Sequence, residues 1–102
     1  MSNMRCFYIV HGFVQGVGYR AFVSGIAKKI GINGFVRNVN DGSVEILAIG
    51  DEYNLKDFEK QINISLGRIE VKSIEKLHDE KQLPKECMKN YNRFLIEKTV
   101  TH

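Results

Sequence analysis

Residues 33–50, NGFVRNVNDGSVEILAIG, contain two runs of alternating apolar and polar residues on either side of Asn40, Asp41 and Gly42. An Asn-Asp-Gly segment between such runs favours a hairpin, because type I′ and related tight turns need residues that tolerate a positive φ. The stretch therefore predicts two antiparallel strands in the middle of the chain.

Two segments with helical periodicity flank this hairpin. Residues 19–31 and 51–67 carry apolar side chains three or four positions apart, which favours amphipathic helices. Asn54 is predicted to cap the second helix, and Gly31 and Gly67 are predicted to end the two helices. The residues expected on the buried faces are Phe22, Ile26 and Ile30 in the first helix and Leu55, Phe58, Ile62 and Leu66 in the second.

Further strands are predicted towards both ends, at residues 5–12, 69–77 and 92–100. The resulting order β-α-β-β-α-β, followed by a C-terminal strand, is that of the ferredoxin-like split βαβ sandwich, an α+β fold. Right-handed crossovers then give an antiparallel sheet of order 4-1-3-2 with both helices on one face. The charged loop 78–91, which contains Pro84, is expected to be polar and mobile.

The first strand runs into a glycine-rich loop, VHGFVQGVGYR, at residues 10–20. Glycines allow backbone N–H groups to converge on a ligand, and the N-terminus of a helix adds the positive end of its dipole. Arg20 follows directly and supplies a positive charge. In the predicted topology residues 37–40 end the second strand at the same edge of the sheet, about 10 Å from the loop. The sequence therefore predicts an anion site there, with phosphate as the expected ligand and with inorganic phosphate or sulfate as the expected competitive inhibitor.

Composition limits the class of protein. With 102 residues, of which 43% are hydrophobic, the chain is expected to form one domain over residues 1–102 and to be a monomer. No apolar run approaches the roughly 18 residues of a membrane span, so a cytoplasmic location is expected. Cys6 and Cys87 are predicted to be free thiols. The formal charge of +3 suits an anionic ligand but is small for a nucleic-acid binder.

Two motifs, GFVQGVGYRAFV at residues 12–23 and GINGFVRNVNDGSVEI at residues 31–46, resemble the paired signature of the acylphosphatase family. The resemblance implies a ferredoxin-like hydrolase that cleaves acyl phosphates to a carboxylate and inorganic phosphate, without metal or cofactor. It also implies that Arg20 clamps the phosphate, that Asn38 holds the attacking water, and that a backbone cradle is formed by Gln15, Gly16, Val17, Gly18 and Tyr19.

The chemistry implied by the resemblance agrees with these residue types. A carboxylate leaves without protonation, so hydrolysis of an acyl phosphate needs mainly positioning and charge neutralisation. The guanidinium of Arg20 offers a planar fork for two phosphate oxygens, and the Asn38 amide can both accept and donate hydrogen bonds. The chain departs from the family pattern at Phe13, where arginine is usual, and at Phe35, where tryptophan is common.

Other functions fit the residues less well. The segment GVGYRA matches a dinucleotide-binding fingerprint, but Asp41 falls in the predicted hairpin turn and not after a second parallel strand. An RNA-recognition module should carry aromatic residues on the third strand of the fold, and SVEILAIG has none. His11 ends an apolar strand and is interpreted as structural. A catalytically silent phosphate-binding or regulatory domain remains an alternative, because a fold does not guarantee an activity.

Overall fold

The computed structural model describes residues 3–102 of the protein. Its helices and strands follow the predicted order, with one short strand and two 3₁₀ turns added. The elements are β1 (Met4–Phe13), α1 (Tyr19–Ile30), β2 (Asn33–Asn38), β3 (Val44–Gly50), α2 (Glu52–Ile62), β4 (Ser65–Leu66), β5 (Ile69–Leu77), η1 (Glu80–Gln82), η2 (Lys85–Met88) and β6 (Phe94–Ile96).

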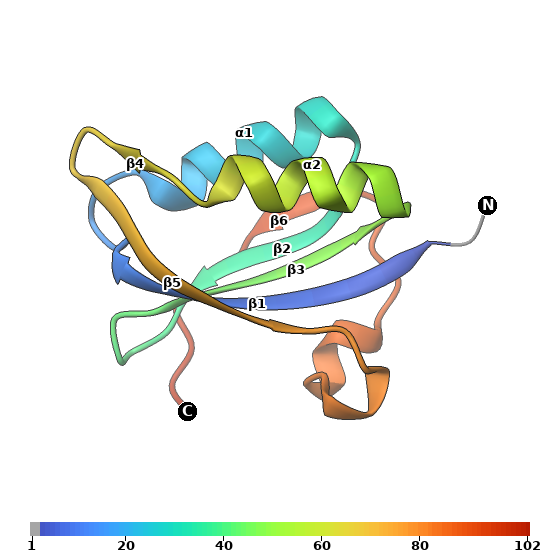
Figure 1. The fold of residues 1–102 in the computed structure, drawn as a ribbon. Helices are drawn as coiled ribbons and strands as arrows, with labels where there is room; N and C mark the ends of the chain where they lie inside the picture. Colours follow the sequence, from blue (N-terminus) through green and yellow to red (C-terminus); the bar gives the residue numbers. More distant parts are fainter. Residues whose placement is uncertain (1–2) are drawn as a thin grey trace.

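Within residues 3–102 the strands form one sheet of order β4-β5-β1-β3-β2-β6. Its central part, β5-β1-β3-β2, is the predicted antiparallel order 4-1-3-2, and α1 and α2 lie side by side over one face (Figure 1). The sequence left the neighbour of the last strand open, and the structure pairs β6 parallel to β2. The fold is therefore the expected ferredoxin-like α+β sandwich.

The predicted hairpin is present, but its turn is not of type I′. The backbone N–H of Gly42 donates to the carbonyl of Val39, and the N–H of Val39 donates to the carbonyl of Ser43. Among the described residues only glycines have a positive φ, and Gly42, with φ of 97°, takes the left-handed position here. The connection is thus a turn closed by one left-handed glycine, in which Asn40 and Asp41 keep ordinary backbone angles.

The prediction for α2 was wrong at both ends. Asp51 is the N-cap, because its side chain accepts a hydrogen bond from the N–H of Asn54 at 2.8 Å, which makes Asn54 the third helical residue. The helix ends at Ile62 rather than at Gly67. Leu66 is 59% exposed in β4, and Gly67, with φ of 59°, forms the turn from β4 into β5.

Apolar side chains cover both faces of the sheet. The larger core lies between the sheet and the two helices, and a second cluster lies on the opposite face beneath η1 and η2 (Figure 1). Leu83 and Cys87 are buried in this second cluster, so the loop 78–91, most of whose residues are exposed, is anchored to the sheet at two points. The members of the second cluster are Phe7, Phe35, Leu47, Ile49, Leu83 and Cys87.

The two cysteines are free and buried on opposite faces of the sheet, as the sequence predicted for their redox state. Burial raises the pKa of the Cys87 thiol to about 12, which keeps it protonated and unreactive near neutral pH. No helix within residues 3–102 is long and apolar enough to cross a membrane.

Candidate active site

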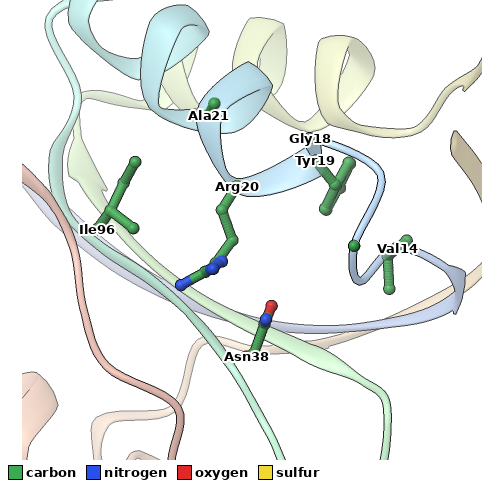
Figure 2. Close-up of a pocket in the computed structure, with 8 residues that line it drawn as sticks. Val14, Gly18, Tyr19, Arg20, Ala21, Asn38 and Ile96 are labelled. Atoms are coloured by element: carbon green, nitrogen blue, oxygen red, sulfur yellow. The ribbon is translucent and has the colours of Figure 1, made fainter.

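A cavity of about 210 Å³ lies where the loop after β1, the start of α1, the end of β2 and the edge strand β6 meet (Figure 2). The predicted topology expected the loop and the end of β2 to share one edge of the sheet, and both line this cavity. The residues that line it are Val14, Gly16, Gly18, Tyr19, Arg20, Ala21, Asn38 and Ile96.

The path of the loop depends on its glycines. Gly16 has φ of 70° and Gly18 has φ of 84°, which are left-handed conformations that other residues adopt only with strain. Among the described residues, the N–H groups of Gln15 to Gly18 donate to no backbone carbonyl and to no side chain. Gly18 is the N-cap of α1 and makes no side-chain cap hydrogen bond, and the first turn of α1 contains no acidic residue. The loop therefore offers unused donors at the positive end of a helix, as an anion site requires.

Three predicted cradle residues use their side chains for structure. The Gln15 amide donates to the carbonyls of Val39 and Ser43 at 2.7 and 2.8 Å, which ties the loop to the hairpin turn. Val17 packs against the helix-side core. The Tyr19 hydroxyl donates to the carbonyl of Ile62 at 2.8 Å, and its burial raises the pKa of this phenol above the usual value. These side-chain contacts hold the loop in place and leave the backbone N–H groups for a ligand.

Arg20 lies in the first turn of α1 and extends across the cavity towards Asn38 (Figure 2). Its Nη1 donates to the carbonyl of Glu97 at 3.4 Å, a long contact, and it forms no ion pair among the described residues. A cation at the N-terminus of a helix opposes the helix dipole. The charge of Arg20 is thus left available for an anion in the cavity.

Asn38 ends β2, and its side chain faces the same cavity (Figure 2). Its Oδ1 atom is buried and has no hydrogen-bond partner among the described residues. A buried acceptor left unpaired costs about 1–3 kcal/mol, so this oxygen favours a site for a water or another donor. The backbone of Asn38 is held in place, because its carbonyl accepts from the N–H of Val100 at 3.0 Å.

Val14, Ala21 and Ile96 complete the wall of the cavity and were not predicted from the sequence. The pattern of residues 92–100 predicted a longer strand than the structure forms, which is β6 at Phe94–Ile96 with one isolated bridge at Val100, and it contained no signal for the partner of this strand. Once β6 pairs with β2, with Ile96 opposite Val36, the strand reaches the cavity. Two usable signals were present, because Val14 lies within the glycine-rich loop and Ala21 follows Arg20 in the first turn of α1.

The neighbouring Arg37 is not part of the cavity, although residues 37–40 were all placed at this edge by prediction. Its side chain lies on the opposite face, where Nε donates to Glu45 at 2.8 Å and Nη2 to Glu86 at 2.9 Å. Burial alone would lower the pKa of Arg37, but these hydrogen bonds raise it above the usual value. His11 does not line the cavity either, and its Nε2 lies 2.6 Å from Glu75. Within residues 3–102 no three His, Cys, Asp or Glu side chains gather as metal ligands.

Fold and cavity together define an α+β protein whose cavity combines a glycine loop at the start of a helix with an arginine that forms no ion pair among the described residues. The chain belongs to the acylphosphatase family, whose family model matches residues 6–95. An acylphosphatase of Moorella thermoacetica is 40% identical over 80 residues, which are 78% of this chain and 86% of that protein. An acylphosphatase of Deinococcus radiodurans is 51% identical over 49 residues, which are 48% of this chain and 56% of that protein, so this match spans about half of each.

The fold of this family is also found in solved structures. The crystal structure of acylphosphatase from Bacillus subtilis superposes with a TM-score of 0.79 and is 35% identical. The match covers 92% of this chain and 98% of that one. Family membership implies a small acyl phosphate as substrate.

Proposed function

We propose that this cavity hydrolyses the carboxyl-phosphate bond of acyl phosphates, as the membership of the chain in the acylphosphatase family leads one to expect. The observation that carries the proposal is the convergence of three features on one space. These are the unused N–H groups of the glycine loop, the guanidinium of Arg20 and the unpartnered Oδ1 of Asn38.

Phosphate binding is assigned to the loop and to Arg20. The amides from Gln15 to Tyr19 supply several N–H donors, and Arg20 supplies a charged pair of donors for two phosphate oxygens. The start of α1 adds the positive end of its dipole. Together these groups neutralise the charge that the equatorial phosphate oxygens carry in the transition state.

Asn38 is assigned to the attacking water. Its buried Oδ1 accepts one O–H of the water, which directs a lone pair of the water oxygen towards phosphorus. The new P–O bond forms to the water oxygen while the P–O bond to the carboxylate oxygen breaks. The carboxylate leaves with the bonding electron pair and needs no proton, and the proton of the water passes to a phosphate oxygen of the substrate.

The sequence-based prediction that no metal or cofactor is needed is kept as part of this proposal. Arg20 and the loop amides provide the charge neutralisation for which other phosphoryl-transfer enzymes use a cation. We further propose that the protein acts as a single-domain monomer in the cytoplasm, which agrees with its length and composition.

The test is the release of inorganic phosphate from benzoyl phosphate by the purified protein in the presence of an excess of chelator. We expect the rate to be the same with and without chelator. A rate that disappears with chelator and returns with a divalent metal would contradict the metal-free mechanism. Binding of inorganic phosphate to the loop without any turnover would support the alternative of a catalytically silent phosphate-binding domain.

A further inference from the structure

Ile96 is a large apolar residue in the wall of the cavity and is 51% exposed. It lies on one side of Arg20, whereas Val14 and the glycine loop lie on the other (Figure 2). The exposed Ala21, in the first turn of α1, also lines the cavity. An apolar surface of this kind contributes nothing to the binding of a phosphate, which needs donors and positive charge.

The position of Ile96 relative to the reacting groups is set by backbone pairing. Ile96 is opposite Val36 in the parallel register of β6 with β2, and Val36 faces the helix-side core. Asn38 is two residues further along β2, so its side chain projects from the same face. The carbonyl of the next residue, Glu97, accepts the hydrogen bond from Arg20. Ile96 is therefore held beside both proposed catalytic groups.

The two ends of an acyl phosphate need different surroundings. The loop amides and Arg20 suit the phosphate end, and Asn38 suits the water. The remaining wall of the cavity includes the apolar residues Ala21 and Ile96, and Figure 2 shows Ile96 on the side of Arg20 away from the glycine loop. An acyl group that extends from the bound phosphate along this wall therefore contacts apolar side chains.

We propose that Ile96 and Ala21 form an acyl-group platform, which makes the substrate class acyl phosphates with an apolar aliphatic or aromatic acyl group. The proposal rests on the proposed function of the cavity. Contact with such an acyl group removes the exposed surface of Ile96 from water, which favours its binding over that of an acetyl group. Binding of the acyl group to the platform is non-covalent, so the only bonds made and broken are those of the hydrolysis.

The experiment compares kcat/KM for acetyl, butanoyl and benzoyl phosphate in the wild type, in Ile96→Thr and in Leu66→Thr. Threonine keeps a β-branched side chain in the strand and replaces apolar by polar surface. Leu66 is the matched control, because it is 59% exposed in the short strand β4 and does not line the cavity. We expect the benzoyl-to-acetyl ratio to fall about tenfold in Ile96→Thr and to stay unchanged in Leu66→Thr.

The outcomes separate this proposal from the proposed function. Hydrolysis of all three compounds with an unchanged benzoyl-to-acetyl ratio in Ile96→Thr would overturn the platform while leaving the hydrolase intact. Absence of hydrolysis by the wild type would instead contradict the proposed function. If Ile96→Thr does not fold, Ile96→Val removes a single methyl group, and the platform then requires a smaller fall in the same ratio.

Discussion

Arg20 and Arg37 lie on opposite faces of the sheet and have opposite surroundings. Arg37 is 3% exposed, donates to two carboxylates and lies with its guanidinium carbon 4.7 Å from the centre of the Phe35 ring. Arg20 is half-buried beside an open cavity and has one long contact, to a carbonyl oxygen. Arg37 thus uses Nε and Nη2 in charged hydrogen bonds within the protein, whereas Arg20 has no carboxylate partner among the described residues.

The same contrast holds between adjacent residues of β2. Arg37 joins the sheet to η2, because it bridges Glu45 in β3 and Glu86 in η2. Glu45 is bound further, by His102, whose Nε2 lies 2.9 Å from Oε2. Asn38, one residue later and on the other face, keeps a buried oxygen without a partner. Satisfied polar groups thus mark the structural face of the sheet, and unsatisfied ones mark the candidate active site.

The largest effect is expected for Arg20→Ala, which removes the free charge from the cavity. We expect kcat/KM for benzoyl phosphate to fall by about 10³-fold or more, by analogy with other arginines that stabilise phosphoryl transfer. Inhibition by inorganic phosphate should weaken as well, and Arg20→Lys should weaken it in part, because lysine lacks the planar fork. Steady-state kinetics with phosphate as competitor measure both effects. Unchanged phosphate inhibition in both variants would show that the phosphate is held elsewhere.

Arg37→Ala should instead reduce stability. Loss of one partner leaves the Glu45 carboxylate buried with a single contact to His102, so we expect a loss of about 3–5 kcal/mol in the free energy of unfolding. Urea denaturation measures this loss, and kcat per folded molecule should stay close to that of the wild type. A fall in kcat with normal stability would assign Arg37 to the catalytic site and remove the contrast with Arg20.

The effect of Asn38→Ala should appear mainly in kcat. Because Asn38 is proposed to orient the water and not to grip the phosphate, kcat should fall by roughly 10²–10³-fold while phosphate inhibition stays almost intact. The control is Asn40→Ala, two residues away in the turn, where the N–H of Asn40 bonds the carbonyl of Val100. This control should lose some stability but little activity. Equal kcat losses in the two variants would mean that the hairpin matters only as structure.

Local patterns predicted much of the fold. The hairpin, α1 and its end at Gly31 follow from periodicity and glycine positions, and the order 4-1-3-2 follows from chirality. The end of α2 was misplaced, because the helical spacing of apolar residues continues to Leu66 while the backbone leaves the helix after Ile62. There Ser65 and Leu66 pair with β5, a non-local contact that periodicity does not report.

The candidate site divides in the same way. Gln15, Arg20 and Asn38 were chosen from two motifs, but the anchoring of the Gln15 side chain to the hairpin turn was not visible in them. Likewise, the alternation of side chains along β2 does not indicate which face carries the candidate site and which carries the ion pairs of Arg37. The packing of η2 beneath the sheet assigns Arg37 to the structural face.

The sequence by itself determined the class of fold, the positions of the glycines that shape the loop after β1, and the residue types that an anion site needs. These depend on backbone conformation and on chemistry local to a few positions. Only the tertiary structure decided that β6 lies beside β2, that Ile96 and Ala21 enclose the cavity with Arg20, and that the charged loop 78–91 covers the second core. The physical reason is that these features depend on contacts between residues far apart in the chain, and such contacts are selected by packing and burial and not by local pattern.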